Sequence, residues 1–240
     1  MNNLPPQSLS MMKSVSSIAP LRVSTHSGST VDRMAYMKRL VIELSKPNLR
    51  ENAIRVLSER TELFHELAPL LWNSVGTIEV LLQARSKEVI PFLLSNEIIP
   101  LCLHSMEIGN ELSKSAATFI LQKILMDEDG LAYVCATAHR FFAVSRILDM
   151  VMEYVQRQPS SRLLKLIIPC YSRLSENRGR AGIALTSSLP GVFANPAFIN
   201  SLREDPTTWR WAEQLYENIR KNRFQSDRMY DIVWSTSPSG

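Results

Sequence analysis

The segment Asn96–Leu125, NEIIPLCLHSMEIGNELSKSAATFILQKIL, decides the fold of this chain. Its apolar residues recur at helical spacing, which predicts one helix over Ile98–Met106 and a second over Leu112–Leu125. Gly109 and Asn110 stand between the two helices and predict a turn. The segment carries no glycine-rich loop, no metal-ligand spacing and no partner for a nucleophile. We therefore expect its role to be geometric rather than chemical.

The composition is that of a globular protein. The chain has 240 residues, of which 45% are hydrophobic and 21% charged, enough to bury a sizeable core. Its net charge of +4 is compatible with a polyanionic partner but does not require one. Cys102, Cys135 and Cys170 are widely spaced among apolar neighbours, which predicts buried free thiols in a reducing compartment rather than a disulfide framework or a zinc site. No apolar run reaches about eighteen residues, so no transmembrane helix is expected.

Helical patterns continue on both sides of the opening segment. Asp32 is expected to cap the first helix, and Pro47 to open the second. Pro69 is expected to break a later helix, and Ser160 or Ser161 to cap one near the carboxyl-terminal end. No stretch shows the period-two alternation of a strand. The chain is therefore predicted to be all-α, with about ten short helices.

The two ends of the chain differ in composition from this helical region. Residues 1–31 contain no Asp or Glu and many serines, which predicts a disordered tail, with an organelle transit peptide as the alternative. Residues 222–240 are polar and are expected to form a flexible tail. The helical domain is predicted over residues 32–221.

Short helices joined by brief polar turns favour a repeat solenoid over a four-helix bundle. In the opening segment, Ile99, Pro100 and Leu101 begin the first helix, and small residues such as Ala116 and Ala117 line the inner stripe of the second. A second, weaker match to this pattern is LIIPCYSRLSENRGRAGIAL, at 166–185. These features, with periods near 40 residues, indicate armadillo-like repeats, whose stacked helices offer long faces that bind other chains.

Four strings then resemble one family over residues 34–219: RENAIRVLSERTELFHELAPLLWNSVGTIEVLLQ, EVIPFLLSNEIIPLCLHSMEIGNELSKSAATFILQKIL, DGLAYVCATAHRF and RLLKLIIPCYSRLSEN. They are similar to the cell differentiation (Rcd-type) proteins, the armadillo-repeat subunit of the CCR–NOT deadenylase complex. The resemblance implies an adaptor without catalytic activity, cofactor or metal. It also implies a role in mRNA decay, translational repression and transcription regulation, in cytoplasmic P-bodies and the nucleus.

The same resemblance implies the partners. These are the NOT scaffold subunit of the complex, tryptophan-containing peptides of mRNA repressors, single-stranded nucleic acid in a basic cleft, and a second copy in a homodimer. No membrane partner is implied.

The chain departs from the family pattern after Gln83. The family continues there through a long central segment, whereas here Gln83 is followed at once by ARSKEVIPFLL. The solenoid is therefore expected to be shortened by about two repeats of ~40 residues. A divergent gene copy, an alternative transcript or a wrongly joined gene prediction would each produce the Gln83–Ala84 junction.

The family's scaffold-binding surface carries over to Asn73, Val75 and Glu79, where the family has His, Phe and Ala. The substitutions replace an aromatic ring with valine and bring a carboxylate into an apolar contact. Burying Glu79 without a partner costs several kcal/mol, so scaffold binding is expected to be weakened or rearranged.

The family's peptide-binding pockets carry over to the carboxyl-terminal repeats. An arginine over an indole ring contributes about 0.5–2 kcal/mol by cation–π stacking. Ala138 replaces a tyrosine of the family pattern and removes one aromatic wall. The expected peptide-binding residues are Pro100, Ala138, Arg140, Arg162, Arg180 and Ala184.

Two other interpretations stay open. The arginines between Arg140 and Arg180 would suit a nucleic-acid groove, or a solvated surface with ion pairs to Glu153 and Glu176. A degenerate copy that has lost its partners is the other alternative, because an internal deletion brings together faces that did not evolve as partners.

Overall fold

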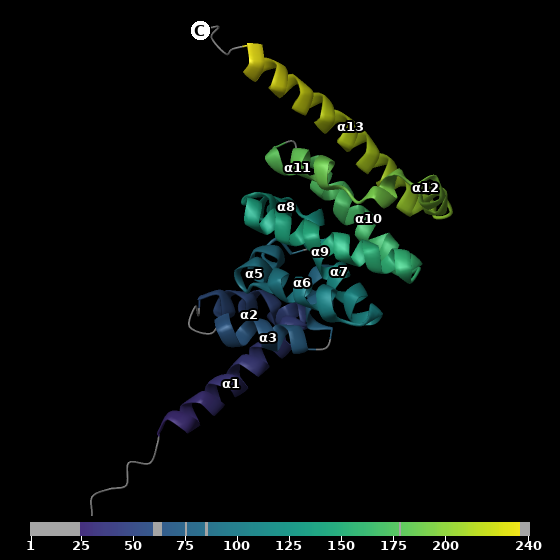
Figure 1. The fold of residues 1–240 in the computed structure, drawn as a ribbon. Helices are drawn as coiled ribbons and strands as arrows, with labels where there is room; N and C mark the ends of the chain where they lie inside the picture. Colours follow the sequence, from purple (N-terminus) through teal and green to yellow (C-terminus); the bar gives the residue numbers. More distant parts are fainter. Residues whose placement is uncertain (1–24, 60–63, 75, 85, 178, 236–240) are drawn as a thin grey trace, which may run out of the picture. The chain divides into compact units, whose positions relative to one another are not determined.

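The computed structural model describes residues 25–59, 64–74, 76–84, 86–177 and 179–235 (Figure 1). Within these ranges every regular element is a helix, and the helices pack in a repeat-like solenoid, which confirms the all-α prediction. The elements are α1 (Thr25–Leu44), α2 (Pro47–Glu59), α3 (Phe64–Asn73), α4 (Thr77–Gln83), α5 (Val89–Ser95), α6 (Ile98–Ile108), α7 (Glu111–Met126), α8 (Glu128–Cys135), α9 (Ala138–Arg157), α10 (Ser161–Glu176), α11 (Arg180–Ser188), the 3-10 helix η2 (Gly191–Ala194), α12 (Pro196–Arg203) and α13 (Pro206–Ser235).

The chain divides into two compact units, Met1–Tyr36 and Met37–Gly240, and the division falls inside α1. Everything below concerns the larger unit. No single described helix is long and apolar enough to span a membrane; α5 and α6 reach that length and composition only as a pair bent by 73°.

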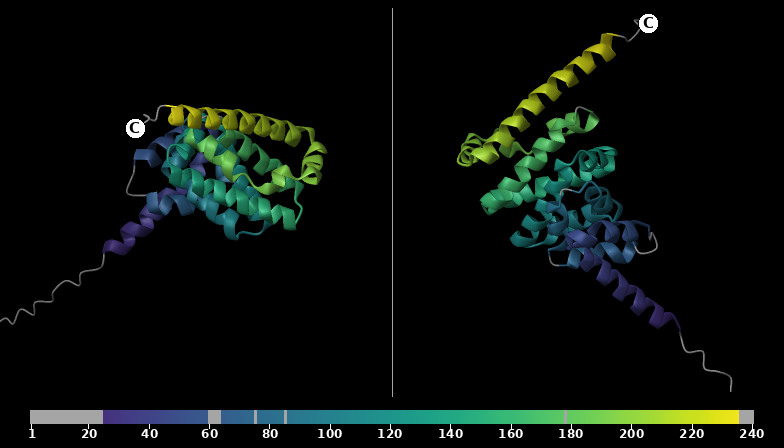
Figure 2. Two further views of the ribbon diagram at one scale, coloured as in Figure 1. Left: turned by 45° about the horizontal axis from the view of Figure 1, so that its top comes forward. Right: turned by 180° about the vertical axis from the view of Figure 1, so that it is seen from behind.

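Helix α10 packs against α7 on one side and against α13 on the other, an order that both views in Figure 2 also show. Near the other end of the larger unit, α2 packs on α5, and α4 packs on both α5 and α7. These contacts cross the Gln83–Ala84 junction. The helices on its two sides are therefore direct packing partners.

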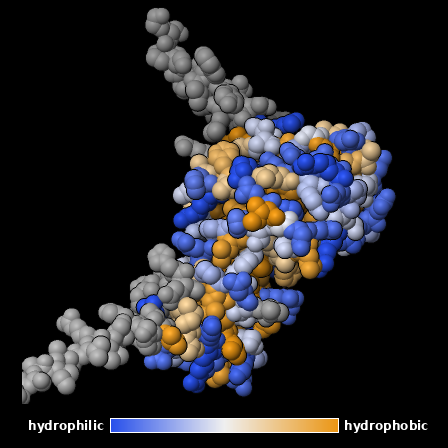
Figure 3. Space-filling model, turned by 60° about the horizontal axis from the view of Figure 1, so that its bottom comes forward, coloured by the Kyte–Doolittle hydropathy of each residue, from blue (hydrophilic) through white to orange (hydrophobic). Residues whose placement is uncertain are grey.

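One continuous apolar core runs through the larger unit, from Leu40 in α1 to Ile219 in α13. Leu57 and Leu81, before the junction, belong to the same buried cluster as Leu93, after it. Apolar residues also reach the surface, where Figure 3 shows them as separate patches among polar residues. The core is thus continuous across the Gln83–Ala84 junction.

Three hydrogen bonds from side chains or to side chains stabilise the turn between α6 and α7. Asn110 caps α7 by accepting a hydrogen bond from the Ser113 backbone N–H at 2.9 Å. The Lys114 Nζ donates to the carbonyls of Met106 and Glu107, at 2.5 and 2.8 Å, and satisfies two carboxyl-terminal acceptors of α6. The turn therefore lies where the sequence predicts it, at Gly109 and Asn110 between the two helices of the opening segment.

The predictions of helix caps and helix breaks are partly confirmed. Ser160, rather than Ser161, caps α10, and a separate α8 precedes the long α9 as the pattern suggested. Asp32 does not cap the first helix, because α1 begins at Thr25 and Asp32 lies within it. Pro69 does not end α3 but lies inside it.

The carboxyl-terminal helix is longer than predicted. We expected the helix to end near Lys221, but α13 continues to Ser235. The residues that follow Lys221 contain no Pro or Gly before Pro238, so polar composition alone did not stop the helix. The tail residues 1–24 and 236–240 lie outside the described part of the chain.

The first prediction tests the α6–α7 turn. A Cβ added at Gly109 would lie 2.4 Å from the Ser105 carbonyl oxygen and 2.7 Å from the Ser113 Cβ, so the turn must open to admit it. Gly109→Ala is expected to lower the free energy of unfolding by about 1–3 kcal/mol, measured by urea denaturation. Gly191→Ala is the matched control, because a Cβ there meets nothing within 4 Å. Equal losses in the two variants would contradict the packing argument.

Candidate functional site

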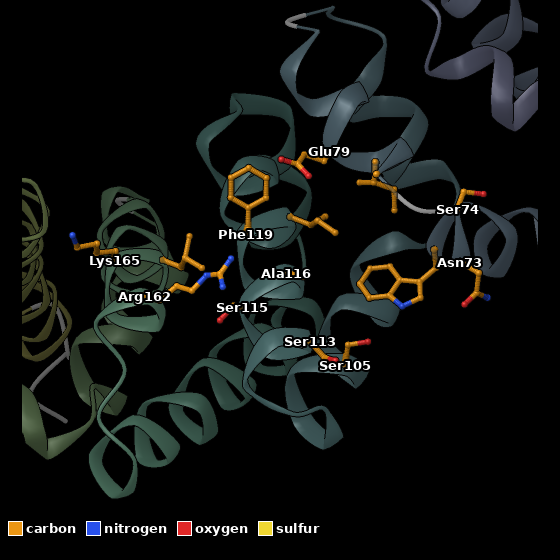
Figure 4. A pocket seen from close by; sticks show the side chains of 15 residues that line it. Asn73, Ser74, Glu79, Ser105, Ser113, Ser115, Ala116, Phe119, Arg162 and Lys165 are labelled. Atoms are coloured by element: carbon orange, nitrogen blue, oxygen red, sulfur yellow. The ribbon is translucent and has the colours of Figure 1, made fainter.

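A groove with a volume of ≈ 760 Å³ lies between helices from opposite sides of the Gln83–Ala84 junction (Figure 4). One wall comes from α3 and α4, the base from α7, and the other wall from α10. Its apolar lining residues are Trp72, Ile78, Ala116, Phe119, Ile120 and Leu166. A groove of this size with an apolar base is suited to hold part of another molecule.

The spacing of residues on α7 explains the base of the groove. Ala116 and Ile120 are four residues apart and so lie on one face, and both line the groove. Ala117, Leu121 and Ile124 lie on the buried side of the same helix. We predicted Ala116 and Ala117 on a single inner stripe; the structure places Ala116 at the groove and Ala117 in the core.

The edge of the groove depends on the turn between α3 and α4. Gly76 adopts a φ of 73°, in the left-handed region that glycine occupies without steric penalty. This turn directs α4 so that Ile78 and Glu79 border the groove.

The charged groups on the two walls differ in sign. Arg162, on α10, makes no ion pair or hydrogen bond with any residue whose contacts the structure describes. Its neighbour Lys165 pairs with Asp205 through an Nζ–Oδ1 distance of 3.2 Å. On the opposite wall, Glu79 accepts a hydrogen bond from the Gln83 amide at 3.3 Å but has no cationic partner among the described side chains. The groove is therefore basic on one side and acidic on the other.

Ser115 borders the groove with an unpaired hydroxyl. The residue is only 2% exposed, and its Oγ has no hydrogen-bond partner in the structure. It also borders a second, smaller hollow of ≈ 380 Å³, which it shares with Arg162 and the first turn of α7. There, the Ser160 hydroxyl donates to the Glu111 carboxylate at 2.6 Å, which joins the beginnings of α10 and α7.

Two of the three predicted scaffold-binding residues lie on one wall of this groove. Asn73 and Glu79 are exposed and line it, and Asn73 donates from its amide to the Pro69 carbonyl at 2.8 Å. Val75 lies outside the described residues. The carboxylate of Glu79 is in contact with solvent in the free protein, so its burial would occur only on binding.

The predicted peptide-binding residues do not gather in one place. Arg162 lines the groove, but Arg140 lies on α9 with its guanidinium over the Tyr133 ring, 3.8 Å from the centroid. Its Nη1 also donates to the Tyr133 carbonyl at 3.4 Å. One face of the Arg140 guanidinium is therefore covered by a tyrosine of the chain itself.

The remaining members of that set are spread over three helices. Pro100 on α6 and Ala138 at the start of α9 are exposed, and Ala184 on α11 is half-buried against the core. Arg180 begins α11, and its side chain lies outside the described part of the structure. Pro100, Ala138 and Ala184 do not line the groove.

Several of the carboxyl-terminal arginines form ion pairs. Arg157 pairs with Glu153 at 3.7 Å, and Arg173 pairs with Glu176 and, at 2.9 Å, with Glu128. These contacts match the interpretation of a solvated surface with ion pairs. They reduce the positive charge available to a polyanion near these residues.

The cysteines are free, as predicted, although only two are fully buried. Burial raises the pKa of the Cys102 and Cys170 thiols well above the usual range. Cys135 is half-buried, and burial raises its pKa to about 11. No group of three or more potential metal ligands occurs among the described residues.

Sequence reasoning missed most of the groove, including Trp72, Ser115, Phe119 and Lys165. The helical spacing of Ser115 and Phe119 on α7 was a usable signal. Nothing in the sequence indicated that α4 and α10 would lie on its two sides, because that arrangement follows from the packing across the junction.

Comparison with known proteins places the chain among relatives. A family model described as the cell differentiation family, Rcd1-like, matches residues 40–84 and 76–219. The two matched segments overlap at residues 76–84, a range that includes the Gln83–Ala84 junction.

Two curated relatives match with similar identity. The cell differentiation protein rcd1 of Schizosaccharomyces pombe is 48% identical over 148 residues, which cover 61% of this chain and 52% of that protein. Protein CAF40 of Saccharomyces cerevisiae is 47% identical over 144 residues, which cover 60% of this chain and 38% of that protein. The matched part of the chain spans about half or less of each relative.

The second prediction concerns thiol reactivity. Because thiolate is the reactive form and the pKa of Cys135 is about 11, alkylation of Cys135 by iodoacetamide should rise about tenfold per pH unit between about pH 7 and 10. Cys102 and Cys170 should stay unmodified until the protein is unfolded in urea, as measured by mass spectrometry. Alkylation of Cys102 in the folded protein at the rate of Cys135 would contradict the burial described above.

Proposed function

The chain belongs to the Rcd1-like cell differentiation family, and from this we propose that it is a non-catalytic adaptor subunit of the CCR–NOT complex. In this role it would connect the complex to other proteins in mRNA deadenylation and decay, in cytoplasmic P-bodies and in the nucleus. The observation that carries the proposal is the groove between α4, α7 and α10.

The groove supports an adaptor role through its construction. Helix α7 supplies an apolar base, and the charges of Glu79 and Arg162, which form no ion pair within the described part of the chain, stand on separate walls. Apolar contact provides affinity, and the placement of charges provides specificity, in interfaces between proteins. A solenoid that exposes such a surface has the properties of a binding platform.

We propose that the NOT scaffold subunit contacts the surface formed by the end of α3 and the start of α4. Asn73 and Glu79 lie there and are exposed. An exposed carboxylate must lose its hydration when a partner covers it, and this loss weakens binding unless the partner supplies a cation.

We also propose that Arg140 receives the indole of a tryptophan-containing repressor peptide. Tyr133 holds the Arg140 guanidinium in place on one face, while Ala138, nearby in sequence, is small and exposed. A guanidinium that is already oriented loses less freedom on binding, which favours stacking of a second ring on its other face.

The third prediction tests the scaffold surface. The full chain is mixed with the binding segment of the NOT scaffold, and the dissociation constant is measured by isothermal titration calorimetry. Glu79→Ala is expected to strengthen binding by about tenfold, because it removes the carboxylate that must be desolvated. Glu51→Ala, an exposed glutamate on α2, is the control and should leave the affinity unchanged. Absence of micromolar binding by both the unmodified chain and Glu79→Ala would contradict assembly with the scaffold.

The fourth prediction tests the Arg140 site. Arg140→Ala should weaken binding of a tryptophan-containing peptide by about 0.5–2 kcal/mol, the range of a cation–π contact. Tyr133→Leu should weaken it less, because the guanidinium remains but is no longer held. Both effects are measured by fluorescence titration of the peptide, with Arg157→Ala as a control on the same helix. Equal affinity in all three variants and the unmodified chain would remove Arg140 from the peptide site.

A further inference from the structure

Ser115 and Arg162 border the same groove, and neither side chain has a hydrogen-bond or ion-pair partner in the described part of the chain. The Ser115 hydroxyl is buried and unpaired, and the Arg162 guanidinium is exposed and unpaired among the described residues. Both residues line the groove and the smaller hollow beside it. Figure 4 shows them on neighbouring helices, with the Arg162 side chain directed toward α7.

Both groups are hydrogen-bond donors that lack an acceptor. A guanidinium binds carboxylates through charge-assisted hydrogen bonds, and a buried hydroxyl without a partner is unfavourable until an acceptor reaches it. The first turn of α7 borders the same hollow, and the positive end of a helix dipole further favours an anion. The region between Ser115 and Arg162 is therefore suited to bind an oxyanion.

The rest of the groove indicates what carries that oxyanion. Phe119, Ile120 and Leu166 form an apolar base, which favours a ligand with an apolar group beside its charge. Glu79 on the far wall and Glu111 in the smaller hollow would repel a chain of phosphates. A peptide with a single acidic side chain meets these conditions better than a nucleic acid does.

We propose that the groove binds a peptide segment of a partner protein through an aspartate or glutamate held by Arg162 and the Ser115 hydroxyl. An apolar residue of the same segment lies on Phe119. Glu79, which forms no ion pair with any described side chain, selects a basic residue at the other end of the segment. The groove is thus polarised: it fixes the direction in which the peptide lies.

The test begins with a displayed library of randomised short peptides, selected on the full chain. Selected sequences are expected to combine an acidic residue with an apolar one, and a basic residue further along. One selected peptide is then synthesised, and its dissociation constant is measured by fluorescence anisotropy. Arg162→Glu should raise that constant by at least about tenfold.

Controls separate the oxyanion site from general charge effects. Arg210→Glu makes the same change of charge at an exposed position of α13 outside the groove, and it should leave binding unchanged. Ser115→Ala should weaken binding less than Arg162→Glu does. Replacing the acidic residue of the peptide with lysine should restore binding to Arg162→Glu, which a damaged fold would not do.

Three outcomes would overturn the assignment. The first is that the selected peptides contain no acidic residue. The second is that Arg162→Glu and Arg210→Glu weaken peptide binding equally. The third is that a single-stranded oligonucleotide displaces the peptide and binds Arg162→Glu more weakly than the unmodified chain. The last would assign the groove to nucleic acid. This inference rests on the adaptor role, but different experiments test the two. The scaffold titration tests Glu79 and the α3–α4 surface, whereas the peptide titration tests Arg162.

Discussion

The structure depends on one constraint: each helix pair of a solenoid must bury its apolar face against the next pair. In this chain the constraint applies at the Gln83–Ala84 junction, where two matched segments of the family model meet. The packing of α2 on α5 and of α4 on α7 meets it, and Leu81 and Leu93 belong to one buried cluster. If the helix faces on the two sides of the junction did not fit together, an exposed apolar surface or a cavity would remain there. Both would lower the stability of the fold.

The groove is a consequence of this packing. Helix α4 comes from before the junction and α10 from well after it, and α7 lies at the base between them. The polarity of the groove, with Glu79 on one wall and Arg162 on the other, therefore depends on how the helices pack across the junction.

Local features of the fold could be read from the sequence, and distant ones could not. Gly109, Asn110 and Ser160 were recognisable because turns and caps depend on residues a few positions apart. The ends of α1 and α13 were misplaced because a helix continues through polar sequence when no breaker stops it. The groove joins α4 with α10, which lie far apart in the chain, so no local pattern contains it.

Arg140 and Arg162 show why residue type alone does not define a site. Both were expected to receive an indole, and both are arginines in the same half of the chain. Tyr133 already stacks on Arg140, whereas Arg162 has no partner among the described residues and lies next to the buried, unpaired hydroxyl of Ser115. A stacked guanidinium favours a flat aromatic ligand, and a free one beside a second donor favours an oxyanion. The two arginines thus favour different ligands, because different neighbouring residues surround their guanidinium groups.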